Sequence, residues 1–221
     1  MTARGIASDE RRTHIAEMIL RLRRAGITDR RVVAAIESVP RDLFVPAELH
    51  ADAYSDRALP IDCGQTISAP VIVGMMTSAL EVGEDDRVLE IGTGTGYQAA
   101  ILARLAQRVY TIERFRTLVA AAESRFRTLR LTNITTLVGD GIGGWPEQAP
   151  FDRIIVTAAG EAVPEALPRQ LRLGGVMVMP VGPVDGVQKL MRYQRGEEGL
   201  AERAIADVRF VPLIPGKALR L

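Results

Sequence analysis

Residues 87–97 read RVLEIGTGTGY, and this stretch decides the fold class of the chain. A short apolar run is followed by three glycines at alternate positions, Gly92, Gly94 and Gly96, and then by a segment compatible with a helix. Glycine has no Cβ and adopts backbone conformations closed to other residues, so the backbone of this loop can come close to a ligand. In an open α/β sheet, the loop after the first strand lies at the carboxyl edge, where ligands bind. The stretch therefore predicts an α/β sheet with a site for a nucleoside-containing cofactor.

The segments after this stretch alternate between strand and helix patterns, which implies parallel strand pairing. The expected strands are 87–91, 108–112, 134–138, 152–157 and 174–181, and the expected helices between them are 97–106, 115–129 and 164–171. Two further strands, 188–194 and 203–211, flank the turn-forming sequence Gly196-Glu197-Glu198-Gly199. The prediction is an α/β fold with a doubly wound, mostly parallel seven-stranded sheet that closes with a C-terminal antiparallel hairpin.

The N-terminal part has a helical pattern. Residues 9–24 carry apolar side chains at helical spacing, Gly26 ends that helix, and Thr28 can cap a second helix that Pro40 stops. A third helix is expected over about 71–80.

These helices define the expected domain organisation. Residues 1–80 should form an N-terminal helical cap and an active-site loop, within the same domain as a Rossmann-like core over 81–221.

Composition narrows the class of protein. The 221 residues include 28 basic and 27 acidic side chains, so the net charge of +1 gives no indication of a nucleic-acid or membrane partner. Cys63 is the single cysteine, which excludes an intrachain disulfide and fits a reducing compartment. Residues 1–12 do not resemble a secretory signal, and no apolar run approaches the ~20 residues of a membrane span. We expect a cytoplasmic protein, with a monomer favoured and no metal site.

Four features fall at the carboxyl ends of successive expected strands. Besides the glycine loop, Glu113 closes the second strand, nineteen residues after Gly94, where an acidic residue can accept hydrogen bonds from both ribose hydroxyls. Asp140, between two glycines after the third strand, could reach an adenine amino group. The strand 151–159 ends in small residues that leave room for a reacting group. Each feature alone is common in turns and strand ends, but together they favour a cofactor site.

The glycine spacing distinguishes between cofactors. A dinucleotide fingerprint is G-x-G-x-x-G, and its helix N-terminus holds a pyrophosphate. Here the spacing is G-x-G-x-G, and Tyr97 stands where the third glycine of that fingerprint would fall. S-adenosylmethionine has no phosphate, so the pattern fits it better than NAD.

With these motifs, the chain resembles the protein-L-isoaspartate O-methyltransferases, a family of seven-stranded S-adenosylmethionine-dependent methyltransferases. Its most specific signals are the loop Gln65-Thr66-Ile67-Ser68, the turn Gly144-Trp145-Pro146 and the strand end Val156-Thr157-Ala158-Ala159. The matching segments are Val39–Pro46, Leu59–Pro70, Val88–Gln98, Val109–Arg114, Gly139–Glu147, Ala149–Ala159, Gln170–Gly175, Pro180–Gly182 and Arg209–Leu213.

The resemblance implies a repair activity, in which the free α-carboxylate of an L-isoaspartyl residue in a damaged protein or peptide receives a methyl group from S-adenosylmethionine, leaving S-adenosylhomocysteine. It also implies residue roles, with Ser68 as the active-site residue. The implied cofactor-binding residues are Thr66, Ile67, Gly92, Thr93, Gly94, Thr95, Gly96, Glu113, Asp140, Gly141 and Thr157. The implied substrate-binding residues are Gln65, Val211, Pro212 and Leu213.

Three positions depart from the family pattern. Thr95 stands where serine is common, Cys63 where many members have tyrosine, and Val71 where histidine is frequent. The hydroxyl at position 95 is kept, whereas a histidine contact to cofactor or substrate is absent at position 71.

The implied chemistry makes modest demands. A carboxylate with a pKa near ~4 is already ionised at neutral pH, so methyl transfer to it needs no strong general base. The two histidines, His14 and His50, lie outside every motif, and Cys63 is expected to pack rather than to react. Because isoaspartate differs from aspartate in its main chain, we expect strand-edge groups around Val211 and the 64–68 loop to read the peptide backbone.

Three alternatives remain open at this stage: a methyltransferase for a small molecule or nucleic acid, an NAD-dependent oxidoreductase, and a non-catalytic binding module with the same fold. The 59–70 loop argues against the first, the glycine spacing against the second, and the intact Ser68, Glu113 and Asp140 against the third.

Overall fold

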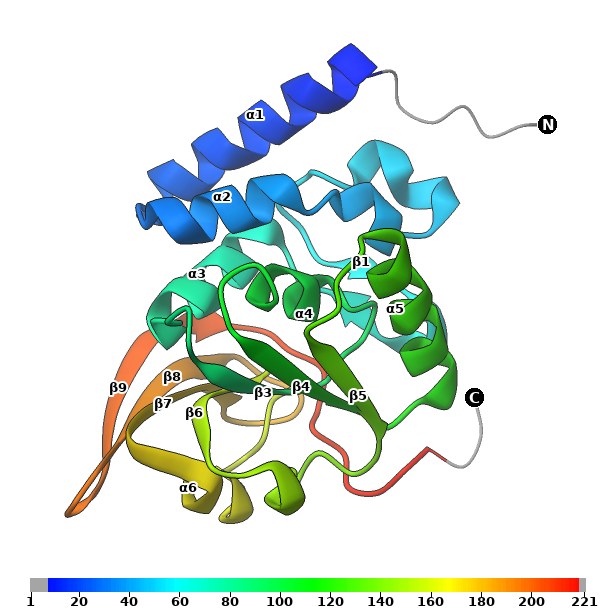
Figure 1. Ribbon diagram of the computed structural model, residues 1–221. Helices are drawn as coiled ribbons and strands as arrows, with labels where there is room; N and C mark the ends of the chain where they lie inside the picture. The colour runs from blue at the N-terminus through cyan, green and yellow to red at the C-terminus, as the bar shows by residue number, and fades with distance from the viewer. Residues whose placement is uncertain (1–7, 219–221) are drawn as a thin grey trace.

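The computed structural model describes residues 8–218 and contains a seven-stranded sheet in the order β5-β4-β3-β6-β7-β8-β9 (Figure 1). The strands are β3 (Arg87–Ile91), β4 (Arg108–Glu113), β5 (Ile134–Val138), β6 (Phe151–Val156), β7 (Leu171–Val181), β8 (Gln188–Gly196) and β9 (Gly199–Val208). Strands β3 to β7 pair in parallel, and β8 runs antiparallel to both of its neighbours. The predicted doubly wound, mostly parallel sheet with a C-terminal hairpin is confirmed. The first seven residues of the predicted cap and the last three of the predicted core lie outside the described residues.

Helices cover both faces of the sheet. They are α1 (Ser8–Arg24), α2 (Arg30–Ser38), α3 (Pro70–Leu80), α4 (Tyr97–Leu102), α5 (Arg116–Thr128) and α6 (Ala166–Gln170). In Figure 1, α1 to α4 are stacked over one face, and α6 lies against the other. Short elements complete the chain: the 3-10 helices η1 (Arg41–Phe44), η2 (Ala47–Asp52), η3 (Asp62–Gly64) and η4 (Pro146–Gln148), and the small antiparallel pair β1 (Leu59–Pro60) and β2 (Thr66–Ile67).

Alternation along the strands builds one buried cluster on each face, because successive side chains of a strand point to opposite sides. Val88 and Val109 belong to the cluster that includes α1, α2 and α3 side chains. Leu89, one residue after Val88, and Ile112, three residues after Val109, belong to the cluster that includes Leu167 of α6. By the same alternation, Glu90 of β3 and its register partner Thr111 of β4 lie on the face that α3 and α4 cover.

The ends of α1 and α2 show what stops and starts a helix here. Gly26 has φ +84°, and the N–H of Ile27 donates to the carbonyl of Leu22 at 3.0 Å, so glycine terminates α1 as predicted. The predicted cap of α2 at Thr28 is wrong. Asp29 is the cap, and its carboxylate accepts the main-chain N–H of Arg31 at 2.8 Å. The helix begins one residue later than expected, and the side chain that reaches its free N–H groups shifts with it.

Several other boundaries differ from the prediction, most clearly that of β9, which spans Gly199–Val208 instead of residues 203–211. Helix α4 ends at Leu102 instead of residue 106, and the side-chain amide of Asn133 donates to the carbonyls of Ala103 and Ala106 at 2.9 and 3.2 Å. A side chain distant in sequence thus satisfies two carbonyls that follow the end of the helix. Strand β7 begins at Leu171, three residues earlier than expected, because α6 ends at Gln170.

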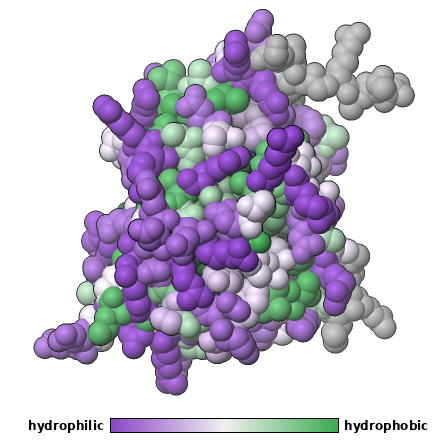
Figure 2. Space-filling model, in the orientation of Figure 1, coloured by the Kyte–Doolittle hydropathy of each residue, from purple (hydrophilic) through white to green (hydrophobic). Residues whose placement is uncertain are grey.

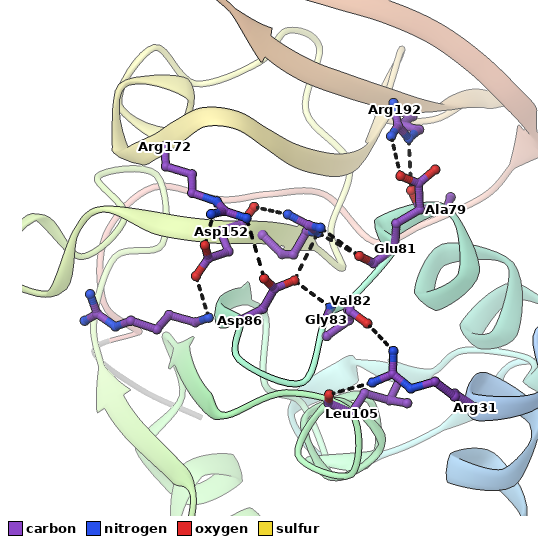
Figure 3. A network of polar contacts seen from close by, with 12 residues as sticks. Arg31, Ala79, Glu81, Val82, Gly83, Asp86, Leu105, Asp152, Arg172 and Arg192 are labelled. Carbon is purple, nitrogen blue, oxygen red and sulfur yellow. Dashed lines mark hydrogen bonds and ion pairs between the residues drawn. The ribbon is translucent and has the colours of Figure 1, made fainter.

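A charged network fixes the amino ends of the central strands, opposite the glycine loop (Figure 3). Asp86, just before β3, lies 3.3 Å from Nε of Arg153 in β6. Nε of Arg172 in β7 lies 2.6 Å from one oxygen of Asp152, whose other oxygen accepts the main-chain N–H of Arg87 at 2.7 Å. These bonds hold three neighbouring strands in register at this edge.

The surface is mixed in character. On the face in Figure 2, apolar residues occur in small groups between hydrophilic ones. None of the helices in residues 8–218 combines the length and the apolar character needed to cross a membrane.

Candidate functional site

A cavity lies at the carboxyl ends of β3, β4 and β6. The chain leaves β3 for β4 and β5 on one side and then returns to β6 on the other, so this is the point where the strand order reverses. Ligands of open α/β sheets bind at such a point. Most of the lining comes from four segments: residues 65–68, the glycine loop 92–95 with Tyr97 and Gln98, residues 112–115, and the C-terminal residues 211–214.

The glycine loop is held by Thr157 at the end of β6. The Thr157 hydroxyl donates to the carbonyls of Ile91 at 3.0 Å and Gly92 at 2.7 Å. Gly92 has φ +96°, and a Cβ there would lie 2.3 Å from the same hydroxyl oxygen, so only glycine fits. Gly96 has a different role: it does not line the cavity, and a Cβ there would lie 2.7 Å from the Phe126 ring of α5.

Glu113 places a fixed carboxylate in the cavity wall. One oxygen accepts the main-chain N–H of Gly94 at 2.9 Å, and the other accepts that of Phe115 at 3.1 Å. Its side chain is buried. Each carboxylate oxygen can accept a further hydrogen bond, so the group is oriented for donors that enter the cavity.

Asp140 lies beside the cavity rather than in its lining. Its two oxygens accept the main-chain N–H groups of Ile142 at 2.9 Å and Gly216 at 2.8 Å. Its carboxylate thereby fastens the C-terminal segment, while the neighbouring Gly141 does line the cavity.

A second carboxyl, Glu90 in the middle of β3, is buried behind the glycine loop. It accepts the hydroxyl of Thr111 at 2.5 Å, and Thr111 lies 2.6 Å from the hydroxyl of Thr93, which lines the cavity. The other oxygen of Glu90 has no partner among the described residues. Burial raises the pKa of Glu90 from 4.5 to about 8, the Thr111 hydroxyl opposes that rise, and the negative charge of Glu113 adds to it. The carboxyl is therefore neutral at pH 7.

The C-terminal segment joins the end of β6. The Val211 carbonyl accepts the N–H of Ala159 at 2.8 Å, and the N–H of Leu213 donates to the Ala159 carbonyl at 2.7 Å. In an extended segment the main chain of residue 212 faces the opposite side, and no hydrogen bond within residues 8–218 uses the Pro212 carbonyl or the Ile214 main chain. The groups available for strand-like pairing are therefore those of Pro212 and Ile214 rather than those of Val211.

The structure brings most of the predicted site residues into one cavity. Those in its lining are Gln65, Thr66, Ile67, Ser68, Gly92, Thr93, Gly94, Thr95, Glu113, Gly141, Thr157, Val211, Pro212 and Leu213. Gly96 and Asp140 are adjacent to it. His14, His50 and Cys63 are not in the lining, and Trp145 packs edge-on against Tyr110 with ring centroids 5.7 Å apart.

Three residues near the site were missed from the sequence: Glu90, Tyr97 and Arg41. Glu90 and Tyr97 stand within residues 87–97, where only the glycines form a recognisable motif. Arg41 belongs to the matching segment Val39–Pro46. Arginine is usually exposed, so the sequence does not indicate that Arg41 is buried.

Comparison with known proteins identifies relatives over almost the whole chain. The profile of the family described as protein-L-isoaspartate(D-aspartate) O-methyltransferase (PCMT) matches residues 13–218. A protein-L-isoaspartate O-methyltransferase of Maricaulis maris is 55% identical over 93% of this chain and 96% of its own length. One of Paracoccus denitrificans is 59% identical over 88% of this chain and 90% of its own.

Solved structures agree on the fold. A protein-L-isoaspartate O-methyltransferase superimposes with a TM-score of 0.80 at 27% identity, covering 90% of this chain and 65% of the other. A Plasmodium falciparum protein, described as a PCMT in complex with S-adenosyl-L-homocysteine, superimposes with a TM-score of 0.78 at 24% identity, covering 90% and 97%.

Proposed function

The chain belongs to the protein-L-isoaspartate(D-aspartate) O-methyltransferase family, and on that premise we propose how its cavity residues divide the work of the reaction. The enzyme depends on S-adenosylmethionine and methylates the free α-carboxylate of L-isoaspartyl residues in proteins and peptides. One observation carries the proposal. The 65–68 loop, which the family signature singles out, and the glycine loop line the same cavity.

The cavity residues fit S-adenosylmethionine. The Glu113 carboxylate suits a pair of ribose hydroxyls, and Ile112 and Phe115 beside it offer apolar surface to a base. When bound, S-adenosylmethionine supplies an electrophilic methyl group on a positively charged sulfur.

The remaining residues act on the substrate. The substrate carboxylate is ionised at neutral pH, and no histidine is among the described residues that line the cavity, so the protein's task is to orient the carboxylate and exclude water. Ser68 would donate a hydrogen bond that directs one carboxylate oxygen. The 65–68 loop and residues 211–214 would cover the reacting groups, and the free Pro212 and Ile214 main chain would pair with the peptide backbone.

Discrimination between isoaspartate and aspartate tests this assignment. The protein is incubated with labelled S-adenosylmethionine and two peptides that differ only in an L-isoaspartyl or L-aspartyl residue. Methyl transfer is expected to the isoaspartyl peptide alone, because main-chain pairing distinguishes a backbone with one extra methylene. Equal transfer to both peptides would contradict this mode of recognition.

Ser68→Ala is expected to lower kcat by about 10- to 100-fold, the loss of one hydrogen bond to a charged group. The dissociation constant of S-adenosylhomocysteine should stay within about twofold, since the cofactor contacts assigned above are elsewhere. Ser55→Ala is the control, because the Ser55 hydroxyl donates to the Asp52 carbonyl outside the cavity. Equal loss of turnover and cofactor affinity in Ser68→Ala would mean that Ser68 only supports the loop.

We also propose that residues 1–80 and 81–221 form one domain and that the enzyme acts as a cytoplasmic monomer without nucleic-acid or membrane partners. Met18 and Leu22 of α1 share a buried cluster with Val88 and Val109 of the sheet, which supports one domain. The free thiol of Cys63 and the net charge of +1 support the rest.

A further inference from the structure

Arg41, the first residue of η1, is a buried cation next to the site. Its side chain is 0% exposed, and no carboxylate within residues 8–218 forms an ion pair with it. Its Nη1 has no hydrogen-bond partner among the same residues. Burying a charge without an opposite charge is unfavourable, so an arginine is an unusual residue at this position.

The contacts of the guanidinium join three segments that are far apart in sequence. Nε donates to the Ala53 carbonyl at 2.7 Å, and Nη2 donates to the Ser68 carbonyl at 2.7 Å. The guanidinium carbon lies 4.8 Å from the ring centroid of Tyr97. Tyr97 is the first residue of α4, directly after the glycine loop, and its ring is buried.

Two of these partners line the cavity, and they come from its two halves. Ser68 belongs to the proposed substrate loop, and Tyr97 follows the cofactor loop. The rigid fork of a guanidinium fixes both the direction and the distance of its hydrogen bonds. A single side chain therefore links the main chain of Ser68 to the first residue after the glycine loop.

We propose that Arg41 is a positioning residue for methyl transfer, which acts through the Ser68 main chain and does not touch substrate or cofactor. The inference rests on the proposed role of Ser68. Its consequence is that loss of Arg41 lowers the turnover of the folded enzyme, in addition to any stability lost because the Ala53 and Ser68 carbonyls are left without their donor.

The experiment compares Arg41→Met with Arg21→Met in the full chain. Arg21 is the matched control, because its Nη2 donates to the carbonyl of Tyr54, the residue after Ala53, but makes no contact with the 65–68 loop. Arg41→Met is expected to lower kcat by about 10- to 100-fold, the scale of effect that misplaced reacting groups produce. Its dissociation constant for S-adenosylhomocysteine should stay within about twofold and the variant should remain folded at the assay temperature, as circular dichroism measures, while Arg21→Met should keep the parental kcat. A normal kcat in Arg41→Met, or a lower kcat that comes with an equal loss of folded protein, would overturn the inference.

A double variant distinguishes positioning through Ser68 from a general disturbance of the cavity. If Arg41 acts through Ser68, Arg41→Met should reduce kcat little further in a Ser68→Ala background. Multiplied losses in the double variant would overturn the inference and leave the role of Ser68 intact. A Ser68→Ala variant with normal kcat would instead contradict the proposed function itself. Arg41→Lys provides a second test, because it keeps the charge without the fork and should also lose turnover.

Discussion

Glu113→Gln is expected to weaken binding of S-adenosylhomocysteine by about 100-fold or more, because hydrogen bonds to a charged group contribute about 1.5–3 kcal/mol each and the carboxylate is assigned to two ribose hydroxyls. The glutamine has nearly the same shape, but it offers one accepting oxygen and no charge. Titration calorimetry with the two proteins measures the change directly.

A second ligand separates contact with the ribose from support of the loop, since Glu113 also accepts the N–H groups of Gly94 and Phe115. The 2′-deoxy analogue of S-adenosylhomocysteine lacks one of the hydroxyls. If Glu113 binds the ribose, the wild-type protein binds the parent ligand more tightly than the 2′-deoxy analogue. The ratio of the two dissociation constants should then fall towards one in Glu113→Gln. An unchanged preference, with both ligands bound more weakly, would show that Glu113 acts on the glycine loop alone.

The sequence was sufficient to predict the sheet and the place of the site because both depend on local patterns. The alternation of strand and helix segments indicates parallel strand pairing, and the glycines at 92–96 mark the carboxyl end of β3. Glu113 could be predicted because its spacing from Gly94 follows from the geometry of the first two strands. The hairpin between β8 and β9 likewise has the two-residue turn Glu197-Glu198 that its sequence indicates.

Other features depend on contacts between distant segments, which local patterns do not reveal. The turn after helix α4 is held by Asn133, which lies beyond the next helix and donates to the carbonyls of Ala103 and Ala106. Asp140 has the expected position in the chain, yet its second oxygen is used by Gly216, 76 residues later. Arg41 and Glu90 are charged residue types in fully buried positions, and only the assembled fold shows what surrounds them.

Glu90→Gln is expected to be more stable than the wild-type protein, by a margin that grows as the pH rises. The Glu90 carboxyl has a pKa of about 8 in the folded protein and an ordinary value of 4.5, so the folded state holds a proton that the unfolded chain releases between these values. The stability that this proton provides is fully present below pH 4.5 and is lost as the pH rises towards 8. Glutamine is neutral throughout, so the variant should gain about 2–5 kcal/mol relative to wild type between pH 5 and pH 8.

Urea denaturation of both proteins at a series of pH values measures this difference, and the remaining titrating groups cancel because both proteins carry them. At pH 5 the two stabilities should be close, since a protonated carboxyl and an amide both accept the Thr111 hydroxyl and both leave the second atom without a partner. Glu123→Gln is the matched control, because Glu123 also accepts a threonine hydroxyl, from Thr136, but at a partly exposed position. Parallel stability curves for wild type and Glu90→Gln would mean that Glu90 is ionised in the folded protein. The charge of Glu113 contributes to the raised pKa of Glu90, so the pH-dependent gain should also be smaller when Glu113→Gln is present in both proteins, which links the buried carboxyl to the carboxylate assigned to the ribose.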